Sequence, residues 1–565
     1  MDRRDFIGSL VVGGSLLSAS SLQAKSITES SKLNSKVVIN ASNLVVGGGL
    51  GGFASALALL RNGQKVVLTE ETDWIGGQLT SQGVPPDEHE WIESHGAPLS
   101  YLNFRERVRD YYRLNYPLTE EQKQNKTLNP GSGSVSRLCH EPRVAVAVLE
   151  SMLMPYISNG QLSVFLGYKA ISSRTNNNYV QEVTIQNISN KNKIVFHAEY
   201  FVDATELGDL LPLTGTEYVK GTESNQETKE IHAPSWSDPE NQQAFTTCFA
   251  MEYLEGEDFV QKPDNYNFWS KYIPNITPAW SGKLLDLSYS HPKTLVPTKL
   301  GFDPTGGNTQ GLFNIWNYRR ILNRHNFTNG FYKGDISLIN WPQNDYLLGN
   351  LIDVSEKKFN QHVEASKDLG RSLLYWLQTE APRDGNKKGW SGLRIKADVM
   401  GTLDGFAKYP YIRESRRIKA DFTITELHVG KENRAKTAGV NEDPTKSAYF
   451  YDSVGVGYYH IDLHPTTKVN YVDFASLPFQ IPLGALLPIR MENILPANKN
   501  IGTTHITNGC YRLHPVEWSI GEAVGLLIVF AKDKRVSPRE VRNNPNLLKS
   551  FQDFLHNQGV ETAWR

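Results

Sequence analysis

The feature that most constrains this fold is a glycine-rich segment at residues 42–71, SNLVVGGGLGGFASALALLRNGQKVVLTEE. Residues 44–46 are apolar and short, as expected for a buried strand. Residues 53–62 carry small and apolar side chains that suit a helix packed on a sheet, and Gly63 is a natural helix stop. Residues 65–69 predict a second strand. This order predicts a β-α-β unit in a parallel sheet.

The glycines between the first strand and the helix are spaced G-x-G-x-x-G. Gly47 permits a tight turn, Gly49 lets a diphosphate approach the backbone, and Gly52 lets helix and strand pack closely. The helix N-terminus offers free N–H groups and a positive dipole to phosphates. Glu70 ends the second strand, where a carboxylate can accept both ribose hydroxyls. We therefore predict a dinucleotide-binding unit rather than a β-α-β unit without a nucleotide.

A second glycine turn follows the acidic pair Glu70-Glu71. It contains Gly76 and Gly77, followed by Gln78, Leu79 and Thr80. The spacing from acid to Gly-Gly resembles that of flavoproteins with two dinucleotide motifs. In those proteins the FAD diphosphate and ribityl chain run past this turn, whereas NAD-binding units rarely need a second close approach. The resemblance favours FAD over a nicotinamide dinucleotide.

Two later segments extend the resemblance. Residues 194–215 form an apolar strand followed by Asp203, Ala204 and Thr205, similar to the flavin motif D-A-T-G-x-G-D; here Glu206-Leu207 replaces the first glycine and its neighbour. Residues 481–530 match the family pattern of an I-P-x-x-x-L-L-P run, a glycine, a histidine-containing loop and a Gly/Ala-rich helix. In such proteins this region folds back onto the first domain and its helix N-terminus faces the flavin pyrimidine, where the dipole would stabilise negative charge.

With RESRR at 413–417 and LINWPQNDY at 338–346, the chain resembles an FAD-dependent oxidoreductase family with exported members, some labelled by analogy with xanthan lyase. The resemblance covers most of the mature chain and says little about substrate. It implies these cofactor-binding residues: Gly47, Gly49, Leu50, Gly51, Gly52, Glu70, Glu71, Gly76, Gly77, Gln78, Thr80, Ala170, Asp203, Ala204, Thr205, Gly502 and Pro515.

The N-terminus predicts an export signal over residues 1–24. Arg3 and Arg4 precede a short apolar stretch rich in glycine and serine, which resembles the twin-arginine motif. An ordinary secretory signal that carries two arginines is the alternative. Residues 25–41 are expected to be a linker, and no other stretch reaches membrane-spanning length. We therefore expect a periplasmic or secreted protein without an integral membrane span after signal removal.

Because flavin motifs occur at both ends, we predict an α/β fold with a discontinuous Rossmann-like FAD-binding domain at 42–215 and 481–565. Residues 216–480 would form an α+β cap that covers the flavin and selects the substrate. Apolar residues recur at helical spacing over 355–380, which predicts a helix in the cap core.

Three residues near the C-terminal helix are candidates for catalysis. His505 and His514 bracket the loop before it, and either could accept a proton as hydride leaves the substrate. Arg512 could hold an anionic substrate or the reduced flavin. For each of the three, a purely structural role is the alternative.

Composition excludes several other classes. Lys plus Arg (59) nearly balances Asp plus Glu (60), so the net charge of −1 gives no electrostatic case for nucleic acid. The three cysteines form no C-x-x-C pair. His140 and Glu141 are adjacent, a poor arrangement for a metal, and no H-E-x-x-H occurs. We predict no catalytic metal.

These observations favour an exported FAD-dependent dehydrogenase or oxidase that takes hydride or electrons from a small organic or sugar-like substrate. An NAD-dependent dehydrogenase sharing only the first motif is one alternative. A carbohydrate-active lyase or binding protein is another, since eleven tryptophans could supply aromatic platforms. The sequence identifies neither the substrate nor the electron acceptor.

Overall fold

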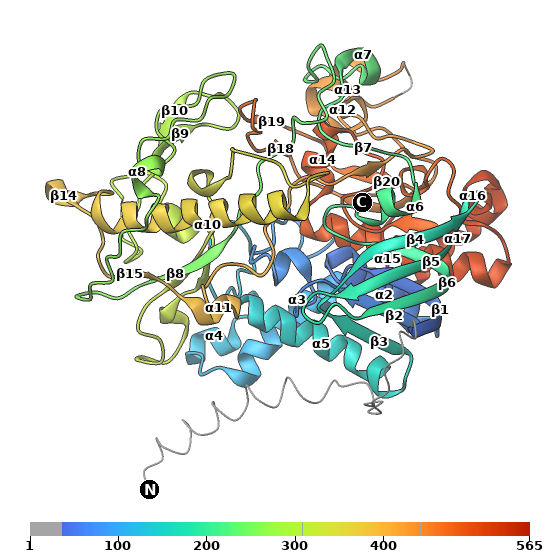
Figure 1. The fold of residues 1–565 in the computed structure, drawn as a ribbon, viewed down its shortest axis with the longest axis horizontal. Coiled ribbons are helices and arrows are strands. Elements are labelled where there is room, and N and C mark those ends of the chain that lie inside the picture. Colours follow the sequence, from blue (N-terminus) through green and yellow to red (C-terminus); the bar gives the residue numbers. More distant parts are fainter. Residues whose placement is uncertain (1–36, 308, 441, 565) are drawn as a thin grey trace, which may run out of the picture. The chain divides into compact units, whose positions relative to one another are not determined.

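A mainly parallel sheet organises one side of the computed structural model, which describes residues 37–307, 309–440 and 442–564 (Figure 1). Within these residues it has seven strands in the order β3-β2-β1-β6-β5-β4, with β21 pairing β6. The strands are β1 (Val37–Val46), β2 (Val66–Glu70), β3 (Leu162–Leu166), β4 (Tyr168–Asn176), β5 (Tyr179–Asn187), β6 (Lys193–Asp203) and β21 (Ile494–Pro496).

The sheet joins segments from both ends of the chain. Strands β1, β2 and β3 are parallel, while β4, β5 and β6 are antiparallel. Strand β21 lies parallel to β6, with Leu495 opposite Val202. Next to it, the Ala204 N–H donates to Val46 O at 2.8 Å, so β6 ends beside the end of β1. Parallel strands that end together leave their carboxyl ends at one edge, where ligands of α/β sheets bind.

Helix α2 (Leu50–Arg61) packs against α15 (His514–Lys534) with almost no side chain between their backbones. A Cβ on Gly521 would lie 2.0 Å from Gly51 O, and a Cβ on Gly51 would lie 1.5 Å from Ala497 O. Helix α2 begins at Leu50 rather than at residue 53, because Gly49 is its extended N-cap. The third motif glycine, Gly52, therefore lies inside the first turn, where a Cβ would lie 1.9 Å from Gly47 O.

A four-stranded antiparallel sheet forms the core of the predicted cap region, in the order β11-β12-β8-β15. Its strands are β8 (Phe249–Tyr253), β11 (Arg320–Leu322), β12 (Ile336–Ile339) and β15 (Leu393–Ile395). Helix α10 (Glu356–Thr379) packs on this sheet with Leu369, Leu373 and Leu377 buried. Its bounds agree closely with the helical pattern over 355–380, and Ser355 caps it by accepting a hydrogen bond from Lys358 N.

Two short strands connect the middle of the chain to α15. Strands β17 (Ser453–Gly457) and β20 (Phe479–Pro482) pair antiparallel. A Cβ on Gly457 would lie 2.7 Å from Val516 of α15, so this pair packs on the helix. Residues 38–565 form one compact unit. Its other helices of at least five residues are α3 (Leu99–Asn115), α4 (Glu120–Gln124), α5 (Pro142–Ser158), α6 (Leu210–Thr214), α13 (Lys431–Thr437), α14 (His505–Tyr511), α16 (Pro538–Asn543) and α17 (Pro545–Asn557).

The predicted signal, residues 1–24, lies outside the described residues, as does the linker up to residue 36. The rest of the predicted linker, residues 37–41, is not a linker: it belongs to β1. The β-branched run Val37-Val38-Ile39 explains the difference, because such side chains favour extended backbone. Among the described helices, none alone is long and apolar enough to span a membrane; α14 and α15 reach that composition only together, across a 93° bend.

The contact between α2 and α15 yields a prediction. Gly521→Ala should lower the free energy of unfolding by about 2 kcal/mol, because the added methyl separates two backbones and overpacking outweighs alanine's better helix propensity. Gly439→Ala is the control, since a Cβ there meets no atom closer than 3.9 Å. Denaturant titration of both variants measures the difference. Equal stability would contradict this account of the packing.

Candidate functional site

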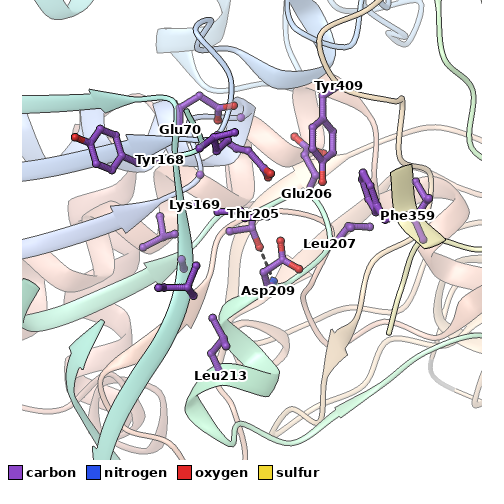
Figure 2. Close-up of a pocket in the computed structure, with 18 of the residues that line it drawn as sticks. Glu70, Tyr168, Lys169, Thr205, Glu206, Leu207, Asp209, Leu213, Phe359 and Tyr409 are labelled. Atoms are coloured by element: carbon purple, nitrogen blue, oxygen red, sulfur yellow. Dashed lines mark hydrogen bonds between the residues drawn. The ribbon is translucent and has the colours of Figure 1, made fainter. Parts of the chain in front are cut away.

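A cavity of about 630 Å³ lies at the edge where β1, β2 and β6 end (Figure 2). The first glycine turn, the residues after β6 and strand β4 contribute to its wall, and the start of α10 closes it from the cap side. Of the residues named from the sequence, the lining includes Gly47, Gly49, Glu70, Glu71, Gly77, Ala170, Ala204 and Thr205. The cavity thus brings together parts of both flavin-like motifs.

The first glycine turn forms its wall with bare backbone. Gly47 has a φ of +98°, and its N–H donates to Thr69 O at 3.0 Å. A Cβ at this position would lie 2.2 Å from Ala204 O. Both the left-handed conformation and the close approach require glycine. Backbone amides at the N-terminus of α2 therefore border the cavity, as anion binding at a helix N-terminus requires.

Glu70 is tied to this turn by hydrogen bonds. Its Oε2 accepts from Gly48 N at 2.8 Å, and its Oε1 accepts from the backbone and the hydroxyl of Thr72, both at 2.9 Å. Burial raises the pKa of Glu70 to about 7, and the bonds from Thr72 and Gly48 only partly oppose that rise. Glu70 is thus a fixed acceptor that titrates near neutral pH.

The second glycine turn links the cavity to the C-terminal helix. The Gly76 N–H donates to Gly48 O at 2.7 Å, and a Cβ on Gly77 would lie 2.9 Å from Gly49 Cα. From the same turn, Gln78 Nε2 donates to Arg512 O at 2.9 Å. The two glycine turns therefore pack directly against each other, and the second turn contacts Arg512, two residues before α15.

Asp203 and Thr205 shape the turn after β6. Asp203 Oδ1 accepts from the backbone and the hydroxyl of Thr205 at 3.1 and 2.7 Å, and burial raises the pKa of Asp203 to about 7. The Thr205 hydroxyl oxygen accepts from Asp209 N at 2.6 Å. Arg416 pairs with Asp209 at 3.0 Å on the cavity wall. These bonds hold the motif in a turn that closes on Gly47.

Glu206, which departs from the family pattern, points at the glycine turns. Its Oε1 lies 2.7 Å from where a Cβ on Gly49 would be. Its Oε2 pairs with Lys499 Nζ at 2.6 Å, and Lys499 also lies 3.1 Å from Glu517 of α15. Burial raises the pKa of Glu517 to about 7, although Lys499 opposes that rise. The positive charge of one buried lysine thus partly neutralises two carboxylates beside the turn.

The two predicted histidines lie in different surroundings. His514 Nδ1 accepts from Asp87 N at 3.0 Å, which places the proton of the neutral ring on Nε2, and burial lowers the pKa of His514 to about 4. His505 Nδ1 lies 2.9 Å from Glu414 Oε2, an arrangement that leaves Nε2 as the nitrogen able to accept a proton. The geometry gives His514 no free lone pair and gives His505 one.

Arg512 completes the loop before α15. Its Nη1 donates to Tyr411 Oη at 2.7 Å, and its Nη2 lies 3.1 Å from Asp462 Oδ2. Pro515 lies in the first turn of α15, and Thr80 donates to Ile75 O at 2.6 Å inside the second glycine turn. Gly502 packs elsewhere, against residues 420–422, where a Cβ would lie 2.5 Å from the Ala420 methyl.

A polar strand near Arg512 was not identified from the sequence. Strand β18 (Ile461–Leu463) and its flanks carry a polar residue at every second position: His460, Asp462 and His464. This period of two could have predicted from the sequence that the three side chains share one face of a strand. His464 Nδ1 lies 2.6 Å from Asp345. Within the described chain, ligand atoms of His460, Asp462 and Asp473 come within 4.8 Å of one another. The Arg512 guanidinium on Asp462 competes with any cation there.

Comparison with known proteins defines the class. The model of the FAD-dependent oxidoreductase family matches residues 44–555, and the chain belongs to this family. No curated protein matches the sequence. Among solved structures, a p-nitrophenol 4-monooxygenase from Pseudomonas putida is similar at 9% identity over 93% of this chain and 88% of its own, with a TM-score of 0.36.

Two further structures match only in part. An L-proline dehydrogenase from P. horikoshii shares 16% identity over 36% of this chain and 27% of its own (TM-score 0.18). The rebeccamycin biosynthetic enzyme RebC shares 14% identity over 39% of each chain (TM-score 0.22). This chain thus spans well under half of both relatives.

The site residues of this member of the FAD-dependent oxidoreductase family fit the cofactor. Several buried polar atoms between the glycine turns and α15 lack hydrogen-bond partners within the protein, which is costly unless a ligand or water satisfies them. They are Gln78 Oε1, both amide atoms of Gln82, Asp203 Oδ2, Glu206 Oε1 and Asn498 Oδ1. Most of these atoms are acceptor oxygens, which suit the hydroxyls and the N–H ring edge of FAD, whereas the bare amides of the glycine cradle suit its phosphates.

Glu70 makes FAD affinity depend on pH. The ribose hydroxyls of a bound FAD would donate to the carboxylate, so binding would favour the ionised form, which dominates in the free protein only above the pKa of about 7. The dissociation constant of FAD should therefore fall as pH rises from about 6 to about 8 and level off above that. Glu70→Gln should weaken binding about 10-fold and flatten the profile.

Fluorescence titration of apoprotein with FAD measures this dependence. Glu356→Gln is the matched control, because this carboxylate lines the same cavity but is 70% exposed. An unchanged pH profile in Glu70→Gln would show that another group titrates.

Proposed function

We propose that this protein is an exported dehydrogenase or oxidase that removes two electrons from a small organic or sugar-like molecule. The observation that carries the proposal is the bond from Gln78 to Arg512 at 2.9 Å. It joins the cofactor side to the polar cluster formed by Tyr411, Asp462 and Arg512, where a substrate can meet both the cofactor and the cap.

The protein's own residues have separate tasks in this scheme. The glycine turns and Glu70 hold the dinucleotide, while Gln78 and the start of α15 orient its reactive end. When bound, FAD supplies a two-electron acceptor. The substrate loses a hydride from carbon and a proton from its hydroxyl or amine, and a base in the protein must take that proton. The cap excludes water from this step.

Two histidines satisfy the requirements for the base. His505 is held by Glu414, and His464 is held by Asp345 with Asp462 3.8 Å from its other nitrogen. In each pair the carboxylate accepts from Nδ1–H and leaves Nε2 for the substrate proton. His514 is assigned a positioning role, because Asp87 occupies its Nδ1.

Export remains part of the proposal and rests on Arg3, Arg4 and the apolar stretch after them. Signals of the twin-arginine type carry folded proteins, which suits a chain that must capture its cofactor before crossing a membrane. Fusion of residues 1–36 to a reporter, with Arg3→Lys/Arg4→Lys as the control, tests this. A reporter exported equally well with both lysines would support the ordinary secretory alternative.

The absorption spectrum of purified protein tests the function, followed by anaerobic titration with alcohols, amines and sugars. We expect flavin absorption that bleaches with one class of substrate. Gly49→Asp should lose the cofactor, because its carboxylate would meet both the diphosphate and Glu206 Oε1. Gly439→Asp, in an exposed loop, should keep it. Polysaccharide cleavage that persists without flavin would favour the lyase alternative.

Substitution of each histidine identifies the base. Of His464→Asn and His505→Asn, the variant that lacks the base should lower kcat about 10²- to 10⁴-fold, because no other group then takes the substrate proton. The other variant serves as the matched control. Steady-state kinetics of both variants distinguish the two. If both variants keep the kcat of the unmodified enzyme, neither histidine is the base.

A further inference from the structure

Three buried arginines meet where the cap sheet faces the start of α15. Arg319, Arg413 and Arg512 are exposed to 7%, 1% and 2%, respectively. A guanidinium buried this deeply needs partners for its charge and its N–H groups. Comparison of the three shows which one has the fewest hydrogen-bond partners within the protein.

Arg413 and Arg512 have close partners. Arg413 lies 3.0 Å from Asp345 and donates to Ala244 O at 2.8 Å. Arg512 donates to Tyr411 and reaches Asp462 at 3.1 Å. These two cations are therefore paired with carboxylates inside the protein.

Arg319 differs from them. Its Nη2 lies 3.3 Å from Asp87 Oδ1 and 3.5 Å from Oδ2, a loose contact, while Nε and Nη1 have no hydrogen-bond partner. Arg413 and Arg512 each leave only Nε without a partner. The Arg319 side chain is only 8% exposed, so water does not replace these bonds freely. Asp87 Oδ1 also lacks a hydrogen bond. A buried ion pair with unsatisfied polar atoms lowers the stability of the protein unless a ligand forms the missing hydrogen bonds.

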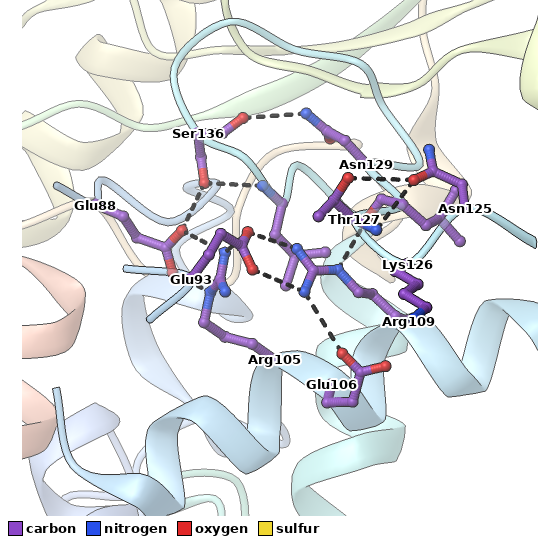
Figure 3. A network of polar contacts seen from close by, with 12 residues as sticks. Glu88, Glu93, Arg105, Glu106, Arg109, Asn125, Lys126, Thr127, Asn129 and Ser136 are labelled. Carbon is purple, nitrogen blue, oxygen red and sulfur yellow. Dashed lines mark hydrogen bonds and ion pairs between the residues drawn. The ribbon is translucent and has the colours of Figure 1, made fainter. Parts of the chain in front are cut away.

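Hydrogen bonds on both sides of Asp87 in the chain fix its position. Glu88, next in the chain, accepts from Arg105, Tyr101 and Ser136 at 2.7 to 2.9 Å, as part of a buried network (Figure 3). On the other side, Asp87 N donates to His514 at the start of α15. Arg319 is thus linked through Asp87 to the start of α15, where the proposed function puts the reactive end of the cofactor.

A second donor lies in the same cluster. Tyr411 Oη accepts from Arg512, so the hydroxyl proton of Tyr411 is available to another acceptor. Burial raises the pKa of Tyr411, which keeps this donor protonated, although Arg512 opposes the rise. The Arg319 guanidinium lies 5.0 Å from the centre of the Tyr318 ring, which supports its orientation.

We propose that the substrate is a small organic acid whose carboxylate binds Arg319 and the Tyr411 hydroxyl. An amine beside that carboxylate carries more than one proton, so it can donate to Asp87 Oδ1 and still give a proton to the base. A hydroxyl in the same position gives its single proton to the base. This inference rests on the proposed function, because it places the acid next to the cofactor's reactive end. It narrows the substrate from small organic molecules in general to hydroxy acids and amino acids.

Binding of redox-inert acids to the FAD-loaded protein tests the proposal without turnover. We expect acetate and benzoate to bind in isothermal titration calorimetry, and acetamide and benzamide, which lack the charge, to bind far more weakly. Arg319→Gln should weaken carboxylate binding about 10- to 100-fold while FAD content stays constant. Arg320→Gln is the matched control, because Arg320 instead bonds Gly131 O and Asp335.

Arg319→Gln leaves Asp87 without its cation, so Arg319→Gln/Asp87→Asn is the second variant, and the same loss is expected. Anaerobic reduction by 2-hydroxy acids and amino acids, compared with their amides, gives the second readout. A yellow protein that binds no carboxylate and is reduced only by neutral molecules overturns this inference alone. A protein that takes up no flavin overturns the proposed function. Carboxylate binding by both Arg319 variants that is as strong as that of the unmodified protein also overturns the inference.

Discussion

Direct backbone contact between the first glycine segment and the C-terminal chain is the constraint on which the rest of the structure depends. Gly51 meets Ala497 O and Gly521 meets Gly51 O, each at a distance that leaves no room for a Cβ. The cofactor wall is therefore assembled in part from segments more than 400 residues apart in the chain, as the link from Gln78 to Arg512 also shows (434 residues). The closure of such long loops costs conformational entropy and slows folding.

Burial of acidic groups dominates the electrostatics of this wall. Glu70, Asp203 and Glu517 all have a pKa raised to about 7, because removal from water outweighs the hydrogen bonds they accept. Lys499 is the buried cation that offsets Glu206 and Glu517. Carboxyl groups with a pKa near 7 change protonation readily when a ligand brings donors or charge. The site is therefore responsive to ligands in the physiological pH range.

Local sequence patterns predicted correctly those elements whose formation depends on residues close together in the chain. The β-α-β unit, Glu70 at the end of β2 and helix α10 could be predicted, because periodicity, glycine spacing and caps act over a few residues. The start of α2 at Leu50 and the extension of β1 to Val37 were missed, although Gly49 as the N-cap and the β-branched run Val37-Val38-Ile39 are local signals for them. Such signals indicate that an element begins nearby but do not define its first residue.

The sequence by itself determined the cofactor class, since a glycine turn followed by an acid admits few other ligands. Only the tertiary structure decided what the individual polar side chains can do. His514 Nδ1 accepts a hydrogen bond from Asp87 N, whereas His505 keeps Nε2 free. Arg319 lies beside the carboxylate of Asp87, 232 residues away in the chain, and two of its nitrogens have no hydrogen-bond partner. The reason is physical: hydrogen-bond partners and burial set the reactivity of a side chain, and here they come from distant parts of the chain.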